Sequence, residues 1–179
     1  MAESHRADTA AAAATQTQEP APAQGALLFR KFDPAAFRWE GVQLEEYKLH
    51  QGEHPGEGWR DITRQVVAGR HGEPCAFRVR YFEVGPGGHS SLEKHTHIHI
   101  VITLRGRGRV IIGDNAYETQ PFDVMYVPPD TPHQFVNDGD EPFGFLCVVD
   151  ADRDRPRPLS PEELARLRAN PATAAVMRV

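Results

Sequence analysis

Four of the nine histidines in this chain are spaced as metal ligands would be. His95, His97 and His99 occupy alternate positions of one short segment, and His133 follows a proline-rich run at 128–132. Alternate side chains of a β-strand point to the same face of the sheet. Neutral imidazole is the commonest protein ligand for transition metals such as zinc, iron, nickel and copper. The sequence therefore predicts a divalent transition-metal site formed by these four residues.

The geometry of a straight strand limits how the first three histidines can share one ion. Strands advance about 3.3 Å per residue, so the Cα atoms of His95 and His97 would lie about 6.6 Å apart, which suits chelation. The Cα atoms of His95 and His99 would lie about 13 Å apart, a span that metal–nitrogen bonds of about 2 Å barely bridge. We therefore expect either a bend near His95 or a site that excludes one of the three.

The elements that must position these residues have the pattern of an all-β protein. Runs rich in β-branched and aromatic residues alternate with runs of glycine, proline and aspartate. The predicted strands are residues 76–84, 97–104, 109–112, 124–127 and 143–149. Turns are expected at Gly85-Pro86-Gly87-Gly88 and at Gly113-Asp114-Asn115. Short strands separated by frequent turns predict a sandwich or barrel.

Composition divides the chain into four parts. Residues 1–26 contain almost no large apolar side chain, so we expect a disordered tail. Residues 27–65 carry several aromatic side chains and are expected to pack on a barrel formed by residues 66–155. Residues 156–179 are expected to form a helical tail, because Ser160-Pro161-Glu162-Glu163 combines an N-cap serine with a proline at the first helical position and a glutamate three residues after the cap.

Charge and composition argue against several kinds of partner. The chain has 179 residues and a formal net charge of −5, so neither nucleic acid nor an anionic membrane is expected. No apolar run approaches the roughly 20 residues that span a bilayer, and we expect no signal peptide. The two cysteines, Cys75 and Cys147, are too few for a disulfide scaffold. We therefore expect a cytoplasmic protein.

The segment from Gly85 to Asn137 resembles the cupin superfamily, whose members are small β-barrels of the jelly-roll type. The first cupin motif contains a glycine, a His-x-His pair, a later glutamate and a closing glycine. The second contains Pro-x-Gly, a histidine and an asparagine. The matching positions here are Gly87, Gly88, His95, His97, Gly106, Asp123, Pro128, His133 and Asn137. The resemblance implies a single cupin barrel with a metal bound by its histidines, and a homodimer, because cupins often dimerise.

The sequence departs from the cupin motifs at three positions. His99 stands where the family has its glutamate, and Phe122 and Asp130 replace glycines near the second motif. An all-histidine set of ligands adds no negative charge, so a divalent ion keeps its full charge. Such an ion favours bidentate anionic ligands, which predicts a small anionic substrate.

The resemblance permits three kinds of function. Some cupin dioxygenases use histidine-only iron sites, so the first hypothesis is a mononuclear non-haem iron dioxygenase that acts on a small anionic substrate. The second is an isomerase, lyase or cyclase in which zinc, manganese or nickel serves as a Lewis acid. The third is a non-enzymatic protein that binds metal or a small molecule. Iron is the metal we expect first, and zinc, manganese, nickel and copper stay open.

The sequence does not assign a general acid or base. Glu93 and Tyr126 are the catalytic candidates, and Tyr81, Gln134 and Cys147 are candidates for lining the pocket. Alternating arginines along a predicted hairpin could form either a solvated face or a rim that attracts anions. These are Arg105, Arg107 and Arg109.

Overall fold

A curled antiparallel sheet of nine strands dominates the computed structural model, which describes residues 28–48 and 58–179. The expected disordered tail, residues 1–26, lies outside the described residues. The strands of the sheet are β3 (Glu45–Glu46), β4 (Arg60–Ala68), β5 (Phe77–His89), β6 (His99–Arg105), β7 (Gly108–Ile112), β8 (Asn115–Thr119), β9 (Val124–Val127), β10 (His133–Val136) and β11 (Phe143–Asp150). The all-β fold predicted from the sequence is confirmed.

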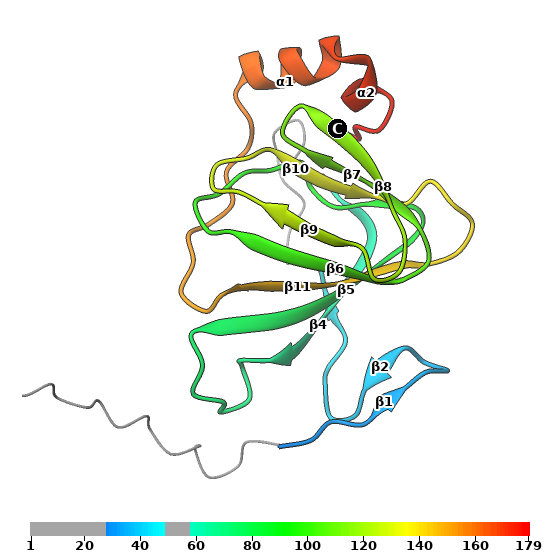
Figure 1. Cartoon of the computed structure of the whole chain (residues 1–179), viewed down its shortest axis with the longest axis vertical. Helices are drawn as coiled ribbons and strands as arrows, with labels where there is room; N and C mark the ends of the chain where they lie inside the picture. Colours follow the sequence, from blue (N-terminus) through cyan, green and yellow to red (C-terminus); the bar gives the residue numbers. More distant parts are fainter. Residues whose placement is uncertain (1–27, 49–57) are drawn as a thin grey trace, which may run out of the picture.

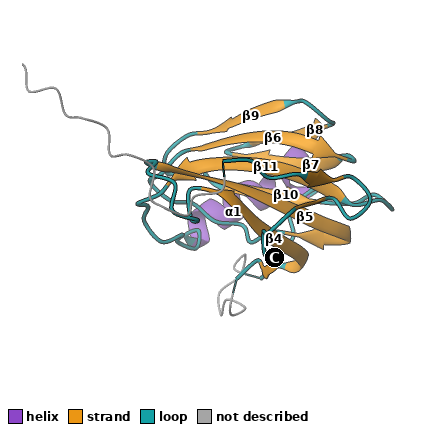
Figure 2. Cartoon of the chain, turned by 90° about the horizontal axis from the view of Figure 1, so that it is seen from below, coloured by secondary structure: helices purple, strands orange, loops and turns teal. Residues whose placement is uncertain are grey.

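The order of the strands brings distant parts of the chain side by side. The sheet runs β8-β7-β10-β5-β11-β6-β9, and β4 pairs with both β5 and β3. Figure 1 shows the two helices at one end of the curled sheet and the hairpin of β1 (Phe32–Asp33) and β2 (Arg38–Trp39) at the other. Figure 2 shows that strands make up most of the molecule and that helix is confined to a small region. Among the described residues, no helix is long and apolar enough to cross a membrane.

Inward-facing side chains of the sheet form the main hydrophobic core. Apolar residues alternate with polar or exposed ones along the strands, so that one face of each strand is buried. The buried members of this cluster are Ile62, Phe82, Val84, Val101, Val110, Met125, Phe135, Phe143, Phe145, Cys147 and Val149. Phe135 and Phe145 stack with ring centroids 4.3 Å apart, which joins β10 to β11 across the interior.

Strand β5 is longer than the sequence predicted, because the expected turn at Gly85-Pro86-Gly87-Gly88 lies inside it. The strand continues to His89, which pairs with Arg60 of β4. A Cβ atom on Gly85 would lie 2.0 Å from the carboxylate of Asp61, and one on Gly88 would lie 2.7 Å from the carbonyl oxygen of Arg60. The glycines therefore allow β4 to approach β5 closely, and the prediction of a chain reversal was wrong.

The two residues that replace motif glycines both adopt left-handed backbone conformations. Phe122 has a φ of 75° and Asp130 has a φ of 54°. Glycine adopts this region without steric cost, whereas a side chain with a Cβ atom is disfavoured there, least so in aspartate and asparagine. Both positions thus adopt a conformation that glycine would adopt at lower steric cost.

Helix α1 (Pro161–Ala169) begins where the sequence predicted. The Ser160 hydroxyl accepts a hydrogen bond from the backbone N–H of Glu163, and the Glu163 carboxylate accepts one from the N–H of Ser160. Leu164 and Leu167 are buried against Leu92, which attaches the helix to the barrel. A second short helix, α2 (Pro171–Ala174), follows at once.

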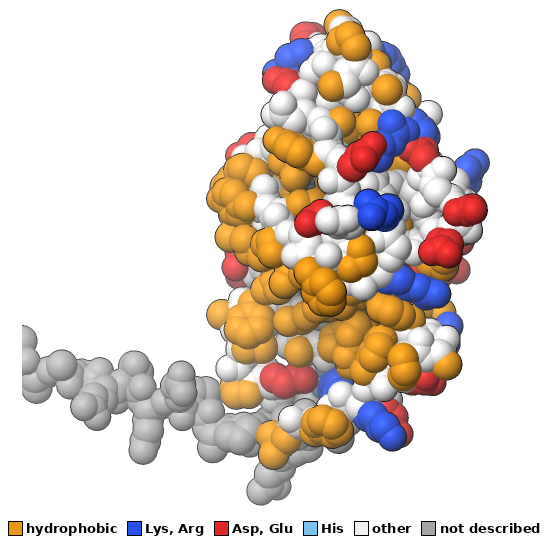
Figure 3. All heavy atoms as spheres, turned by 45° about the vertical axis from the view of Figure 1, so that its right-hand side comes forward, with side chains coloured by type: hydrophobic (Ala, Val, Ile, Leu, Met, Phe, Trp, Pro, Cys, Tyr) orange, Lys and Arg blue, Asp and Glu red, His pale blue; other side chains and the backbone are white. Residues whose placement is uncertain are grey.

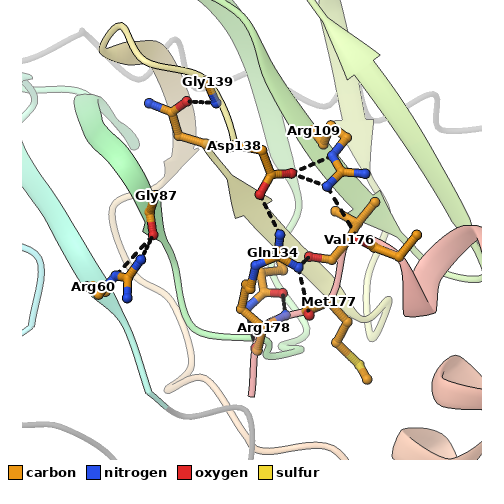
Figure 4. Close-up of polar contacts among 11 residues, drawn as sticks. Arg60, Gly87, Arg109, Gln134, Asp138, Gly139, Val176, Met177 and Arg178 are labelled. Carbon is orange, nitrogen blue, oxygen red and sulfur yellow. Dashed lines mark hydrogen bonds and ion pairs between the residues drawn. The ribbon is translucent and has the colours of Figure 1, made fainter.

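The last residues of the chain are fixed to β10 by polar contacts, shown in Figure 4. The side-chain amide of Gln134 donates to the carbonyl oxygen of Arg178 at 2.7 Å and accepts from its N–H at 2.9 Å. The Asp138 carboxylate forms ion pairs with both Arg109 and Arg178. The C-terminal residues therefore cover the outer side of β10.

Aromatic residues of the N-terminal segment pack on the outer side of β5. The rings of Phe37 and Trp39 both lie 5.3 Å from the ring of Tyr81, and Phe32 contacts Phe37 with centroids 4.9 Å apart. The boundary expected between residues 65 and 66 falls inside strand β4. The residues on the two sides of this boundary therefore belong to one strand of the sheet.

Candidate metal centre

A bend in the chain before β6 brings the four histidines together. Residues 95–98 are not part of a strand, and β6 begins at His99. The ring centroid of His95 lies 4.5 Å from that of His99 and 4.8 Å from that of His133. His97 stacks on His95 with centroids 3.5 Å apart. The bend that the sequence required for a shared site is therefore present.

Contacts of the backbone fix this bend. The N–H of Asp130 donates to the carbonyl oxygen of His95 at 2.7 Å, so the proline-rich turn before β10 supports the first histidine. The N–H and C=O groups of Glu93 pair with those of His133. Backbone hydrogen bonds thus connect the two segments that carry the histidines directly, in addition to the strand pairing within the sheet.

In three of the imidazoles, the Nδ1 atom already makes a hydrogen bond. The Nδ1 atom of His95 lies 2.8 Å from the carbonyl oxygen of His97, and that of His133 lies 2.9 Å from the carbonyl oxygen of Thr131. The Nδ1 atom of His97 lies 2.7 Å from the carboxylate of Asp154. A carbonyl acceptor at Nδ1 requires the proton there, which leaves Nε2 with a free lone pair. Metal-binding histidines in proteins are typically held in this way.

The remaining nitrogens fit a divalent metal ion. Among the described residues, Nε2 of His95 and both nitrogens of His99 are buried without a hydrogen-bond partner. A ligand atom from each of His95, His97 and His99 lies within 4.8 Å of the others. Buried polar atoms rarely lack a partner in a stable protein, and a bound cation would supply one. The residues therefore fit a metal ion, whose identity the geometry leaves open.

The surroundings favour the neutral form of three of these imidazoles, those of His95, His99 and His133. Burial, together with the charges of His133 and His97, lowers the pKa of His95 to about 4. Burial lowers the pKa of His99 far below its ordinary value, and it lowers that of His133 as well. Only a deprotonated imidazole nitrogen binds a metal, so the site is ready for an ion at neutral pH.

The histidines open into a cavity of about 620 Å³ inside the curled sheet. Its wall combines apolar side chains of the core with the histidines and several charged groups. The charged and titratable lining residues besides the histidines are Tyr47, Lys48, Arg64, Arg80, Glu93, Cys147, Arg153 and Arg155. A cavity of this size accommodates a small organic ligand.

Comparison with known proteins identifies the family. Residues 80–149 match the family model of the cupin domain. A curated protein from Rhodospirillum rubrum, named 1-methylthio-D-xylulose 5-phosphate methylsulfurylase, is 44% identical over 149 residues, which are 83% of this chain and 91% of that protein. The chain belongs to the cupin family. This cupin is also similar to a glucose-6-phosphate isomerase of Pyrococcus furiosus, at 30% identity over 70% of the chain but only 60% of that protein.

A solved structure agrees with this assignment. The crystal structure of a cupin 2 conserved barrel domain protein from Rhodopseudomonas palustris has 36% sequence identity and a TM-score of 0.74. The match covers 84% of this chain and 99% of that one. The single cupin barrel predicted from the two histidine motifs is therefore confirmed.

Of the two catalytic candidates, Glu93 lies in the cavity of this cupin. It is 8% exposed, and its carboxylate accepts hydrogen bonds from Lys48 and from the hydroxyl of Ser91. A carboxylate oxygen of Glu93 lies within 4.8 Å of ligand atoms of His95 and His133. Burial raises the pKa of Glu93, but the Lys48 ammonium outweighs it and holds the pKa below its ordinary value. Glu93 is therefore an ionised carboxylate beside the histidines.

Tyr126 lies on the other face of the sheet. In β9, Val127 pairs with His99 and is buried, so its neighbour Tyr126 points outward and is 52% exposed. Tyr126 does not line the cavity. The catalytic role considered for Tyr126 does not suit this position. Which residues of β9 point inward depends on the register of β9 with β6.

The other candidates divide between the cavity and the exterior. Cys147 lines the cavity, whereas Tyr81 packs against Trp39 and donates a hydrogen bond to Glu83. The amide of Gln134 binds the C-terminal backbone. These contacts of Tyr81 and Gln134 do not involve the histidines.

The three alternating arginines do not line this cavity. Arg105 pairs with Glu83 and Arg109 pairs with Asp138, so both belong to the exterior. Arg80 and Arg153 line the cavity instead, and sequence reasoning missed both. For Arg80, the available signal was a charged residue between apolar neighbours in a predicted strand. Only the register of the sheet shows that this position of β5 points inward.

The outer face carries hydrophobic side chains that are exposed in the single chain. Phe122, Val124 and Tyr126 are 80%, 68% and 52% exposed. Figure 3 shows hydrophobic side chains across one side of the molecule, interspersed with charged groups. The homodimer expected from the family stays a prediction.

Proposed function

We propose that this cupin is a metal-dependent enzyme that acts on the carbon–sulfur bond of a phosphorylated ketose carrying a methylthio group at C1. The observation that supports this most is the 44% identity, over 91% of its length, to a relative named 1-methylthio-D-xylulose 5-phosphate methylsulfurylase. The cavity supports it as well, because it combines four imidazoles with several cationic side chains. A phosphorylated ketose is a small anion, as the histidine-only site led us to expect.

The histidines would hold the metal, and a bound divalent ion supplies Lewis acidity toward a carbonyl oxygen. The protein's own contribution is orientation. The Nδ1 contacts of His95, His97 and His133 fix the orientation of these three rings and leave their Nε2 atoms available to a metal. The surrounding apolar wall, with Phe82, Phe135 and Phe145, limits access of water.

Cleavage of the carbon–sulfur bond of the proposed substrate requires a nucleophile and a proton in addition to the metal. When the bond between C1 and sulfur breaks, the carbonyl group at C2 stabilises an electron pair that remains on C1. This requires that a nucleophile such as a small thiolate attack the methylthio sulfur as the bond breaks, which forms a mixed disulfide, and that C1 take up the proton that the thiol has lost. Glu93 is the carboxylate in the cavity that is placed to hold or transfer a proton.

A second candidate function is the interconversion of an aldose and a ketose phosphate. It is favoured by the ionised Glu93 beside the histidines, which suits a base that removes a proton next to a carbonyl. Relatives named glucose-6-phosphate isomerase share 30% identity with this chain. An iron dioxygenase, our first hypothesis from the sequence, has no comparable support among the named relatives.

One set of assays separates these activities. Protein loaded with Mn(II), Fe(II), Co(II), Ni(II) or Zn(II) would be incubated with 1-methylthioxylulose 5-phosphate, with and without a small thiol, and the products followed by NMR and mass spectrometry. We expect loss of the methylthio group that depends on metal and on His133. Conversion of pentose or hexose phosphates alone would favour the isomerase instead. Oxygen consumption with Fe(II), without loss of the methylthio group under nitrogen, would contradict the proposal and favour the dioxygenase.

A further inference from the structure

Arg80 places a positive charge inside the cavity, and none of the carboxylates in the described part of the chain pairs with it. The residue is 9% exposed and lines the cavity. Its Nε atom has no hydrogen-bond partner, and among the described residues its one hydrogen bond joins Nη2 to the sulfur of Cys147 at 3.4 Å. The guanidinium also lies 5.1 Å from the ring centroid of Phe82. A buried charge is costly unless an opposite charge compensates it.

The contact with Cys147 does not provide that compensation. Cys147 is buried, and burial raises the pKa of its thiol although the neighbouring Arg80 guanidinium acts in the opposite direction. The thiol is therefore neutral at neutral pH and accepts only a weak hydrogen bond. Cys147 therefore supplies no negative charge to compensate that of Arg80.

The other charged groups of the cavity increase the excess of positive charge. Among the described residues that line it, five are cationic and Glu93 is the single carboxylate. Glu93 is already paired with Lys48, and Arg64 is paired with Glu45 at 2.6 Å. Arg153 donates only to two nearby backbone carbonyls, at 3.4 and 3.5 Å. Among the described residues, three guanidinium groups of the lining, those of Arg80, Arg153 and Arg155, thus have no carboxylate partner, and Arg155 is the most exposed of them.

Arg80 and Arg153 also lie close enough to repel one another. Burial, together with the charges of Arg80, Arg78 and Arg64, lowers the pKa of Arg153 to about 10. Like charges gathered in a partly buried place are favourable only when an anion binds between them. Guanidinium groups match the oxygens of a phosphate with paired hydrogen bonds.

We propose that Arg80 and Arg153 bind the phosphate group of the substrate, at a distance from the histidines that selects a small phosphorylated sugar. The identity of that substrate rests on the proposed function, whereas the uncompensated charge is a property of the cavity itself. In the sheet, Cys147 of β11 pairs with Arg80 of β5 on one side and with Val101 of β6 on the other. His99 lies two residues before Val101, so the Cα atoms of Arg80 and His99 are about 12 Å apart, two strand spacings across the sheet and two residues along β6.

The test is binding of phosphate in the absence of turnover. Isothermal titration calorimetry would use inorganic phosphate, xylulose 5-phosphate and unphosphorylated xylulose, with the full chain in metal-free and metal-loaded forms. We expect both phosphate compounds to bind the metal-free protein and xylulose not to bind it. Arg80→Met and Arg153→Met should each weaken phosphate binding by roughly 10-fold or more. The matched control is Arg107→Met, which removes an exposed arginine outside the cavity and should bind as the original protein does.

A thermal unfolding scan keeps the test valid if a variant is unstable. Without phosphate, Arg80→Met should melt no lower than the original protein, because an uncompensated buried charge is removed. Phosphate should raise the melting temperature of the original protein and of Arg107→Met, but not that of Arg80→Met. If Arg80→Met fails to fold, Arg153→Met, whose side chain is less buried, carries the same comparison.

The outcomes separate this inference from the proposed function. Unchanged phosphate binding in both Arg80→Met and Arg153→Met would overturn the inference, and so would phosphate binding that requires the metal. Phosphate binding that depends on Arg80 would stand even if the protein fails to act on methylthio ketoses. Activity on such a ketose with an unchanged KM in Arg80→Met would support the proposed function and refute the phosphate site.

Discussion

Asp154 is expected to control the metal affinity of this cupin without binding the metal. Its carboxylate accepts three N–H groups of the bend: the backbone N–H of Thr96 at 2.9 Å, that of His97 at 3.1 Å, and Nδ1 of His97 at 2.7 Å. Burial raises the pKa of Asp154, but these hydrogen bonds together outweigh it and hold the pKa well below its ordinary value. Asp154 is thus ionised, and it fixes both the bend and the proton on Nδ1.

Replacing Asp154 by alanine removes all three acceptors. Loss of a group that orients a metal-binding histidine typically lowers metal affinity about 10- to 100-fold, or about 1.4 to 2.7 kcal/mol. Asp154→Asn keeps one oxygen acceptor without the charge, so its loss should be smaller than that of Asp154→Ala.

The assay is competition with a chromophoric chelator, using Zn(II) or Mn(II) and the full chain. Asp152→Asn is the matched control, because this exposed aspartate lies two residues away in the same segment. An affinity in Asp154→Ala that equals that of the control would refute the argument that Asp154 orients His97.

Three further outcomes are expected. His133→Ala should lose the metal, measured by elemental analysis after dialysis, and full occupancy would exclude a site shared by both motifs. Gly144→Ala should destabilise the fold by about 1 to 3 kcal/mol in urea unfolding, because its Cβ would lie 1.9 Å from the hydroxyl of Tyr81; an unchanged midpoint would contradict this. Burial raises the pKa of Asp138, but Arg109 and Arg178 outweigh it and lower that pKa. Its ion pairs should therefore stabilise the fold above the ordinary carboxyl pKa of 3.8 and lose this effect as the pH falls further. Asp138→Asn should cost at most about 1 kcal/mol at pH 7 and less at pH 3, and an equal cost at both values would refute the linkage.

The sequence predicted what depends on residue type and local spacing. The histidines were identifiable because their alternate spacing suits metal ligation, and a bend was one of the two outcomes foreseen because a straight strand separates His95 from His99 widely. The start of α1 was identifiable because a capping box uses only the residues from Ser160 to Glu163.

What the sequence could not supply depends on how the strands pair. Tyr126 appeared to be a catalytic candidate until the register of β9 with β6 placed it on the outer face. Arg80 was not singled out from the sequence, because only the pairing of β5 with β11 shows that it lies on the inner face of the sheet. A shift of one residue in either register would have exchanged the two faces, and no local pattern determines that choice.

The close spacing of three of the histidines in the sequence also bears on how a metal ion would reach this site. His95, His97 and His99 lie within five consecutive positions, so an unfolded chain already carries three of the four ligands. An ion that binds the unfolded chain as well as the folded one stabilises the fold less than its total affinity suggests. We therefore expect metal capture to begin before the barrel closes, with His133 completing the set of ligands when β10 joins the sheet.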